Sequence, residues 1–401
     1  SGWLAAAYLS WNFKNFNIKV IDKEIGTPVG VGEATLLNFP TFLSSCGFTI
    51  DEWFHEVGAT EKLGIHFVNW IDKNKDVYHP FYNILTENID YKKAMVTKFN
   101  NLSNVAYHVN CGKLVLFLQE KLKNKIEFIK QDVKEVIYNE AGIKNLILKN
   151  KKKIKADLYI DCTGFNSILK NKTQKIMLKD RLICDTAVAS QIPYKNIKKE
   201  LLPYTKCEAV EEGWVWSIPV SDRIGSGFIF NRDITNINNA KDFFVKHWDN
   251  RIKKENLKVI DWTPYYDNKI WDKNVVSIGL SAGFIEPLES TGLMLAMEGI
   301  YSLCKKIYKH SYHENDENYY NNHMKMFYEN SIDFVNMHYL VSKRKGIFWE
   351  KGRQLKQSER FNLFKQDVLN KNYKDLNETN IFNDTDCFTS SSWFCWLKQT
   401  L

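Results

Sequence analysis

The stretch SGWLAAAYLSWNFKNFNIKVID, at residues 1–22, predicts an apolar helix followed by a strand that ends in an acid. This order is the second half of a βαβ dinucleotide-binding unit. Gly2 matches the last glycine of a G-x-G-x-x-G fingerprint, so we expect the first strand and the glycine loop, roughly 10–15 residues, to precede Ser1. We expect Gly2 and Trp3 to lie against a dinucleotide and Asp22 to bond a ribose hydroxyl; a surface loop acid is the alternative for Asp22.

The composition fits a globular α/β protein with a sizeable core. The chain has 401 residues, of which 44% are hydrophobic and 25% charged, with a net charge of +8. The densest basic run, residues 149–155, falls between two strand-like segments, residues 142–148 and 154–161. Such a run is typical of a solvated hairpin turn, and no aromatic or nucleic-acid-binding motif accompanies it. We therefore expect no nucleic-acid partner.

The eight cysteines form no C-x-x-C pair and no zinc-ligand spacing. Most have apolar neighbours, which predicts buried free thiols in a reducing compartment. The most apolar helix, residues 293–307, carries Glu298 and two lysines, so it does not predict a membrane span. We expect a cytoplasmic protein with neither a metal ion nor a membrane partner.

Two further strands end in residues that suit close approach to a nucleotide. Residues 133–161 predict a β-meander that ends in Asp161-Cys162-Thr163-Gly164, and residues 276–279 predict a short strand that ends in Gly279. Glycine lets the backbone approach a ligand closely. We expect Asp161, Gly164 and Gly279 to contact the cofactor. From residue 292 onward the chain predicts mostly helix, and residues 371–386, rich in Asn and Asp, predict a loop.

Four short features carry the chemistry: Val-Gly-Glu-Ala-Thr at residues 31–35, Lys62, Gly-Trp-Val-Trp-Ser-Ile-Pro at residues 213–219, and Phe-Ile-Glu-Pro-Leu-Glu-Ser-Thr-Gly at residues 284–292. Trp214 and Trp216 lie two residues apart on a predicted strand, so their rings point to one face; plain core packing is the alternative. A helix that begins after residue 291 offers unpaired N–H groups, which suit an anion. Ordinary capping by Ser290 or Thr291 is compatible with that reading.

In this order, the features resemble the flavin-dependent halogenases of the tryptophan halogenase family. Residues 213–219 match its GWxWxIP signature, and residues 284–292 match its FxxPxxSxG pattern. The resemblance covers essentially the whole chain but is weak after about residue 310. It implies a glutathione-reductase-like, Rossmann-type FAD-binding module over residues 1–310, discontinuous and with substrate-covering insertions near 62–105 and 180–270. Residues 311–401 would form a helical substrate-binding region.

The resemblance also implies site residues. It places Thr291 and Gly292 on the halide, which is chloride, bromide or iodide, through their backbone. It places the two tryptophans behind the flavin, where they keep organic substrate away from it. The residues that it implies for FAD contact, beyond those named above, are Glu33, Ala34, Trp214, Trp216 and Pro287.

Lys62 matches the catalytic lysine of the family, which holds hypohalous acid or forms a haloamine. Its neighbour Glu61 departs from the aromatic residue usual there. Glu289 matches the glutamate that polarises hypohalous acid or accepts the ring proton, and Glu286 is its rival in the sequence. The resemblance implies that His79 and Phe81 stack on the substrate, and we add Trp393 as a further wall of that pocket.

The implied reaction uses reduced FAD from a separate NAD(P)H-dependent flavin reductase, together with O2 and halide. Hypohalous acid would reach Lys62 and halogenate an indole- or phenol-type ring. Residues 225–227, Gly-Ser-Gly, lack the third glycine of a second nucleotide site. The chain is shorter than expected for enzymes that grip free tryptophan, so we expect an open, tolerant site. An FAD monooxygenase and an inactive flavin-binding protein remain alternatives, and the sequence leaves a homo-oligomer open.

Overall fold

The computed structural model describes residues 1–22, 33–81, 89–97, 105–170, 174–308, 314–370 and 386–400. Val31 and Gly32 of the predicted motif at residues 31–35, and residues 371–385 of the predicted loop, lie outside these ranges. Within the described part of the chain, no helix combines the length and the apolar character needed to cross a membrane.

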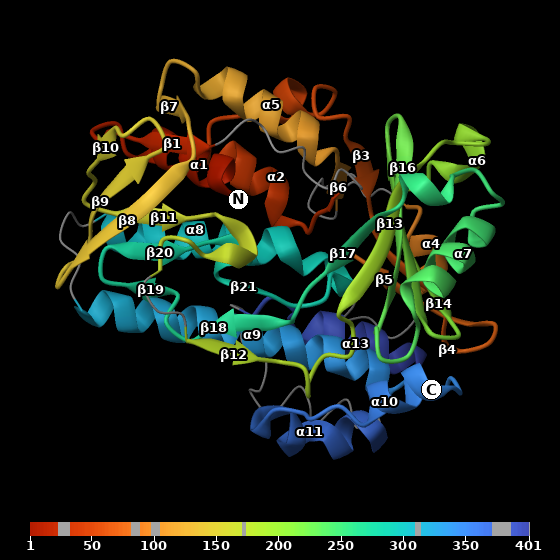
Figure 1. Cartoon of the computed structure of the whole chain (residues 1–401). Helices are drawn as coiled ribbons and strands as arrows, with labels where there is room; N and C mark the ends of the chain where they lie inside the picture. The colour runs from red at the N-terminus through yellow and green to blue at the C-terminus, as the bar shows by residue number, and fades with distance from the viewer. Residues whose placement is uncertain are drawn as a thin grey trace.

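The nucleotide-binding half has the predicted helix–strand order. Helix α1 (Gly2–Asn12) leads to strand β1 (Lys19–Asp22), which pairs in parallel with β7 (Glu127–Lys130). A second parallel pair joins β11 (Tyr159–Asp161) to β20 (Val275–Ser277). Helix α1 is apolar all round and its residues 3–10 are buried, because it is packed between α5 (Cys111–Leu122) and α8 (Thr291–Ile307) (Figure 1). The helix–strand order and the parallel pairing agree with the predicted Rossmann-type module.

The predicted meander is present, with one difference. Strands β8 (Val133–Asn139), β9 (Gly142–Leu148) and β10 (Lys153–Ile154) form an antiparallel sheet, and the lysine-rich run makes the turn between β9 and β10. The single strand expected at residues 154–161 is two short strands, β10 and β11, in different sheets. The break follows from pairing, because β10 turns back on β9 whereas β11 joins β20.

A seven-stranded sheet forms the other half of the molecule (Figure 1, at the right, with β13, β14 and β16 in green). Its strands in spatial order are β17 (Lys258–Asp261), β13 (Thr186–Ile192), β16 (Arg223–Phe230), β15 (Gly213–Val220), β14 (Thr205–Val210), β4 (Gly64–Asp72) and β5 (Lys75–Pro80). Every pair is antiparallel except β14 with β4. The two segments expected to cover the substrate therefore share one sheet.

Two further three-stranded sheets and several short helices complete the described part of the fold. Strand β6 (Ala106–Val109) lies between β2 (Glu33–Ala34) and β3 (Thr60–Lys62), strand β18 (Tyr265–Asp267) lies between β12 (Lys175–Met177) and β21 (Gly283–Phe284), and β19 (Trp271–Asp272) extends β20. The short helices are α2 (Asn38–Ser44), α3 (Ile50–Trp53), α4 (Tyr91–Ala94) and α6 (Ile197–Glu200).

The two faces of strand β15 meet different cores. Trp214, Trp216 and Ile218 belong to the main core, whereas Val215 packs in a second core under α7 (Ile237–His247). This alternation confirms that both tryptophans share one face. A Cβ atom on Gly227 of β16 would overlap the Trp216 ring, so the glycine makes room for that ring. Pro219 lies inside β15, paired with Ile224.

In the described residues after α8 there are four helices, in agreement with the predicted mostly helical C-terminal part. They are α9 (Glu314–Leu340), α10 (Ile347–Arg353), α11 (Glu359–Asn370) and α13 (Ser390–Gln399). Helix α9 packs on α8 and α10, and α13 packs on β5. The Gln399 side chain accepts from the Tyr78 N–H at 2.9 Å and donates to the Tyr78 carbonyl at 2.7 Å. Helix α13 thereby occupies the outer edge of the seven-stranded sheet.

Candidate active site

Lys62 lies at the end of β3 and is fully buried. Its Nζ donates to the Thr35 carbonyl at 2.8 Å and to the Ser290 hydroxyl at 2.8 Å. The Phe81 ring centroid lies 4.8 Å from the same nitrogen. These contacts fix the amine between the motif at residues 31–35, the start of α8 and one aromatic face.

Burial lowers the pKa of Lys62 to about 7, because desolvation disfavours the ammonium form and the nearby Glu289 only partly opposes it. Near neutral pH, both the ammonium and the free amine are therefore populated. The amine can donate hydrogen bonds in either form and is a nucleophile when neutral.

The segment before α8 has an unusual backbone. Glu289 and Ser290 have φ values of 61° and 64°, in the left-handed region that favours glycine. Each such residue costs of order 1–3 kcal/mol and persists where its surroundings hold it. Ser290 occupies the N-cap position of α8, but its hydroxyl accepts from Lys62 and makes no side-chain cap, so the capping alternative does not hold for the Ser290 side chain. The conformation instead presents Ser290 to Lys62 and Glu289 to the core.

The Glu289 carboxylate is buried among three N–H donors. His79 Nδ1 lies 2.9 Å from both carboxylate oxygens, and His338 Nε2 lies 2.8 Å from Oε1. The Trp396 indole N–H donates to the same Oε1 at 3.1 Å. Burial alone would raise the pKa of Glu289, but His79 and His338 outweigh it and hold this pKa below its usual value. Glu289 is thus an ionised carboxylate near neutral pH.

His338 shows how the charge is held. Its Nδ1 faces the Phe334 carbonyl at 2.7 Å, which can only accept a hydrogen bond. The ring therefore directs Nδ1–H to α9 and presents Nε2 to Glu289, so it donates to the carboxylate only in its imidazolium form. Burial lowers the pKa of His338, and the bond to Glu289 opposes that effect.

The predicted residues Lys62, Glu289, His79 and Phe81 come together in the structure. The His79 and Phe81 rings lie 6.1 Å apart, as expected for positions two apart along an extended chain. His79 Nδ1 is hydrogen-bonded to Glu289. We therefore expect a flat ligand to stack on Phe81 rather than on His79. Substrate contact by either residue stays a prediction.

Sequence reasoning missed His338, Trp396 and Ser290. The aromatic segment at residues 392–396 drew attention to Trp393, which the structure buries against Phe334 and Phe361 at 5.2 and 5.9 Å. Trp396, one turn later, reaches Glu289 instead. Its pairing with a histidine in α9 has no local signature, since the two residues are far apart in sequence. Trp393 as a substrate wall stays a prediction.

The flavin side of the site was predicted from glycines and strand ends. Gly2, Cys162 and Gly279 come together: a Cβ on Gly2 would lie 3.5 Å from Cys162 Cβ, and a Cβ on Gly279 would overlap Ser1. Gly164 and Gly279 have φ values of 74° and 71°, which suit glycine. Open space surrounds the Cβ positions of Gly164 and Gly292, so a ligand can approach both backbones.

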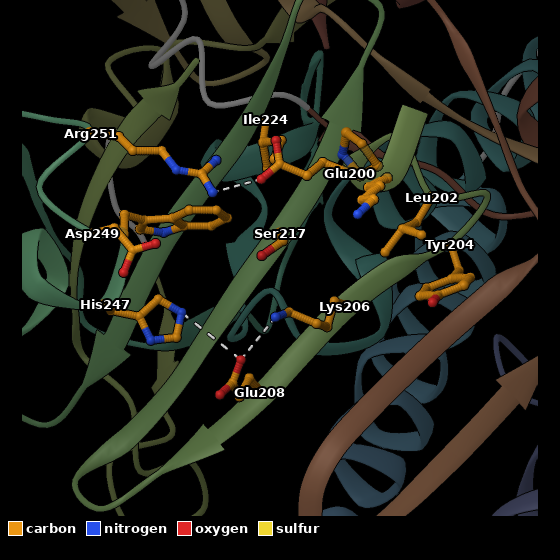
Figure 2. Close-up of a pocket in the computed structure, with 13 residues that line it drawn as sticks. Glu200, Leu202, Tyr204, Lys206, Glu208, Ser217, Ile224, His247, Asp249 and Arg251 are labelled. Atoms are coloured by element: carbon orange, nitrogen blue, oxygen red, sulfur yellow. Dashed lines mark hydrogen bonds and ion pairs between the residues drawn. The ribbon is translucent and has the colours of Figure 1, made fainter. Parts of the chain in front are cut away.

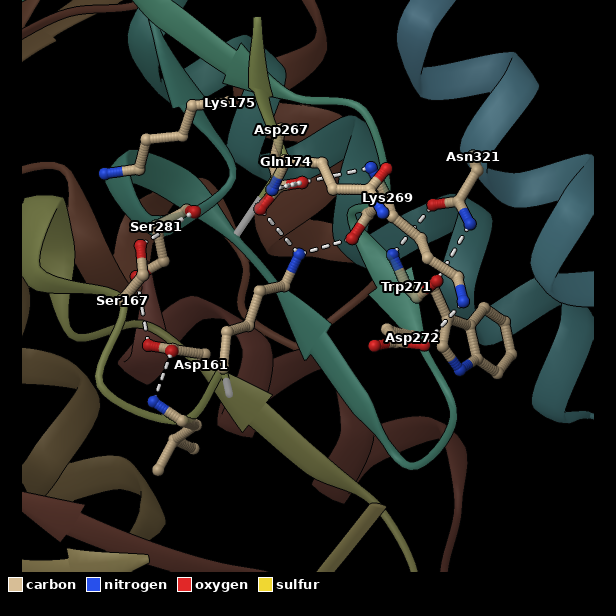
Figure 3. A network of polar contacts seen from close by, with 12 residues as sticks. Asp161, Ser167, Gln174, Lys175, Asp267, Lys269, Trp271, Asp272, Ser281 and Asn321 are labelled. Carbon is tan, nitrogen blue, oxygen red and sulfur yellow. Dashed lines mark hydrogen bonds and ion pairs between the residues drawn. The ribbon is translucent and has the colours of Figure 1, made fainter. Parts of the chain in front are cut away.

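Asp161 has partners within the protein for both carboxylate oxygens (Figure 3). Thr163 donates to Oδ1 through its N–H and hydroxyl, at 2.9 and 2.6 Å, and the Ser281 hydroxyl donates at 3.1 Å. The Leu169 N–H donates to Oδ2 at 2.9 Å. In the same network, Lys170 and Asp267 form a buried ion pair at 2.9 Å. Asp161 thus shapes the loop around Gly164, and its predicted contact with the cofactor stays a prediction.

The other residues predicted to contact the flavin or the halide lie on separate elements. Trp3 is buried in α1, and its indole N–H lacks a hydrogen-bond partner within the described part of the chain. A buried donor without a partner fits hydrogen bonding to a polar group of a bound cofactor such as FAD. Asp22 ends β1, Glu33 and Ala34 form β2, Pro287 precedes Glu289, and Thr291 begins α8.

A cavity of about 460 Å³ lies on the opposite face of β15 from the two tryptophans (Figure 2). Ser217 lines its floor. Two cationic side chains on its walls have acidic neighbours: Arg251 pairs with Glu200 at 2.6 Å, and Lys206 pairs with Glu208 at 2.9 Å. The Trp216 side of the sheet, not this cavity, faces the core that holds Lys62 and Glu289.

The chain is similar to known proteins over most of its length. The sequence model of the tryptophan halogenase family matches residues 1–96 and 84–399. The chain is 28% identical to the tryptophan 6-halogenase ThaL of Streptomyces albogriseolus and 26% identical to the tryptophan 7-halogenase RebH of Lentzea aerocolonigenes. Each match covers 90% of this chain and 78% of the relative.

Solved structures share the fold. A tryptophan halogenase from Shewanella frigidimarina superposes with a TM-score of 0.88 at 24% identity, covering 100% of this chain and 86% of that one. The tryptophan 6-halogenase SttH of Streptomyces toxytricini superposes with a TM-score of 0.86 at 23% identity, covering 99% and 88%. The chain belongs to the tryptophan halogenase family. The predicted class, a flavin-dependent halogenase among the oxidoreductases, is confirmed at the level of the family.

Proposed function

We propose that this enzyme uses reduced FAD, O2 and a halide to halogenate an electron-rich aromatic ring, with Lys62 as the residue that delivers the halogen. The observation that carries the proposal is a buried amine held by Thr35 and Ser290 beside the Phe81 ring. A solvated surface lysine would show none of these contacts. The domain division, with residues 311–401 on the substrate side, is part of the proposal.

Bound reduced FAD supplies the oxidising power, drawn from O2, that turns halide into hypohalous acid. The backbones of Gly164 and Gly279, the Trp3 indole N–H and the Trp214–Trp216 face would hold it. The N-terminus of α8 at Thr291 and Gly292 offers N–H groups and a positive dipole end to the halide. A separate NAD(P)H-dependent reductase would provide the reduced flavin.

Lys62 is suited to the delivery step. Two N–H directions are used by Thr35 and Ser290, which leaves the remaining direction of a neutral amine for its lone pair. The amine can hold hypohalous acid by a hydrogen bond. It can also react with it, forming an N–halogen bond and releasing water. In either form, the halogen lies within reach of a ring beside Phe81.

Glu289 is better suited to stabilise charge than to take up a proton. Three N–H donors keep it ionised, and a carboxylate with a lowered pKa is a weak base. We infer that it stabilises the cationic ring formed when halogen adds to the aromatic carbon. Glu286, its rival in the sequence, faces Tyr339 instead.

The proposed substrate is an indole or a phenol. ThaL and RebH are named as tryptophan halogenases, and the Phe81 face suits a flat, electron-rich ring. A panel of indoles and phenols tests this part of the proposal. If free tryptophan were the only compound that reacted, the expected open site would be contradicted.

The test is a turnover assay with FAD, a flavin reductase, NADH and each halide in turn, analysed by mass spectrometry. Lys62→Met should lower halogenated product by about 10²–10⁴-fold, the usual contribution of such a group, while flavin oxidation continues. Lys206→Met, on the outer face of the sheet, is the matched control. Oxygenated product without halide would support a monooxygenase instead, and FAD binding without turnover would support an inactive flavoprotein.

A further inference from the structure

A row of buried polar groups runs next to the site without contacting Lys62 or Glu289. The Trp214 indole N–H donates to the Tyr339 hydroxyl at 3.1 Å, and that hydroxyl donates to the Glu286 carboxyl. All three side chains are at most 1% exposed. The row joins β15, α9 and the segment before α8, which are distant in sequence.

The Glu286 end is connected to the halide-binding position. The Thr291 hydroxyl lies 3.5 Å from the Glu286 backbone carbonyl, and Thr291 is the first residue of α8. Glu286 therefore links the tryptophan strand, through Tyr339, to the helix end that we propose for the halide. Packing alone does not fix the Trp214 ring in this way, since its edge contact with Trp70, at 6.0 Å, has no directional polar bond.

Burial shifts the ionisable members of the row toward their neutral forms. Burial raises the pKa of Glu286 to about 7, against the hydrogen bonds from Tyr339 and Cys184. Burial also raises the pKa values of Tyr339 and Cys184 well above their usual range, and Cys184 Sγ lies 3.5 Å from the Tyr339 hydroxyl. The second Glu286 oxygen, Oε2, lacks a hydrogen-bond partner among the described residues. A charged carboxylate there would be costly, so the protonated acid is favoured.

We propose that Tyr339 and Glu286 are positioning residues for halogenation: they hold the Trp214 wall and the Thr291 end of α8 in one fixed relation. The proposal rests on the functions proposed above for Trp214 and Thr291. If this relation loosens, the oxidising power drawn from O2 is lost as hydrogen peroxide before it reaches the halide. The residues act on the fraction of flavin turnover that yields halogenated product.

The test uses Tyr339→Phe, which removes one hydroxyl and keeps the ring. Tyr320→Phe is the matched control, because Tyr320 is a buried tyrosine on the same helix whose hydroxyl donates to the Gly299 carbonyl at 3.2 Å. The first readout needs no turnover: the indole N–H signals of the 15N-tryptophan-labelled protein, with Trp214 identified by its loss in Trp214→Phe. The Trp214 signal should shift and exchange faster in Tyr339→Phe and stay in place in Tyr320→Phe.

The second readout is the ratio of halogenated product to hydrogen peroxide per NADH consumed. It should fall about threefold to tenfold in Tyr339→Phe, the worth of one hydrogen bond, and stay unchanged in Tyr320→Phe. Glu286→Gln, whose amide resembles the neutral acid, should keep the ratio within about twofold of the wild type. Glu286→Ala should lower it further.

An unchanged Trp214 signal in Tyr339→Phe would show that Trp214 is not hydrogen-bonded to Tyr339, which overturns the proposed row. A shifted signal with an unchanged product ratio would leave the hydroxyl purely structural and overturn the positioning role. If Glu286→Gln were as poor as Glu286→Ala, the carboxyl would act as an anion, contrary to the proposal. If the wild-type protein formed no halogenated product, the proposed function would be refuted. The Trp214 indole signal would still show whether the row of hydrogen bonds exists.

Discussion

Lys62 and Glu289, both within the described part of the chain, make no ion pair with each other, although Ser290 joins them. The Lys62 amine donates to the Ser290 hydroxyl at 2.8 Å, while the neighbouring Glu289 carboxylate faces His79, His338 and Trp396. The separation explains their opposite electrostatics. The pKa of Lys62 is lowered, which favours the neutral amine. The pKa of Glu289 is lowered by its own hydrogen-bond donors, which favours the carboxylate anion.

The first prediction concerns the pH dependence of stability. The folded pKa of Lys62 is about 7 and the unfolded pKa is 10.5, so between these values the unfolded state binds more protons and this group makes stability rise with pH. Below pH 7, both states are protonated and the penalty of the buried charge is fully present. Lys62→Met should therefore stabilise the protein more at pH 6 than at pH 9, measured by urea unfolding. An equal gain in the free energy of unfolding at both pH values would show that the pKa of Lys62 is not lowered.

The second prediction concerns His338. His338→Ala leaves a buried carboxylate without its partner at 2.8 Å, and breaking such a pair costs about 3–5 kcal/mol. Because the pKa of Glu289 is lowered, its contribution to stability is present above pH 4.5 and is lost as pH falls below that value. Urea unfolding at pH 7 measures the loss. The double variant His338→Ala/Glu289→Ala should lose less than the sum of the single variants, and strict additivity would contradict the pairing.

The third prediction concerns Trp396. Trp396→Phe removes an indole N–H that donates to an ionised group, a bond worth about 1.5–3 kcal/mol, and keeps most of the ring. We expect lower stability and a lower halogenation rate, measured by thermal unfolding and by product formation. Trp393→Phe, which leaves the three donors of Glu289 in place, should have the smaller effect on rate. If the Trp393 variant were the more severe, that residue would be the substrate wall.

The fourth prediction separates stability from function at the start of α8. A Cβ at Gly292 meets open space, and alanine is the better helix former, so Gly292→Ala should raise stability by up to about 1 kcal/mol. The added methyl group enters the space proposed for the halide, so the halide KM should rise while the KM of the organic substrate stays the same. An unchanged halide KM would move the halide site elsewhere.

Much of the site followed from local patterns. The alternation of residues 213–219 gave the shared face of Trp214 and Trp216, since strand periodicity needs no long-range information. The position of Lys62 next to the start of α8 followed from the family resemblance. The choice between Trp393 and Trp396 did not follow, because both lie on the inner side of one helix and only tertiary packing decides which reaches Glu289.

The remaining features depend on pairing between distant segments. The parallel pairing of β4 with β14 joins residues about 140 positions apart, and nothing in either strand marks its partner. Ser290 looked like a helix cap, and its left-handed backbone, which turns the hydroxyl to Lys62, is set by the surrounding core. His338 lies in a helix with a weak apolar pattern, where a buried histidine resembles any other core position.

The two hydrogen bonds between the Gln399 side chain and the Tyr78 backbone bear on how the protein is made. Helix α13 carries both Gln399 and Trp396, so the last donor of Glu289 comes into place only when this helix docks on β5. A ribosome must therefore release a segment more than 300 residues downstream of Lys62 before the charged centre is complete. Until then, the Glu289 carboxylate lacks one of its three N–H donors.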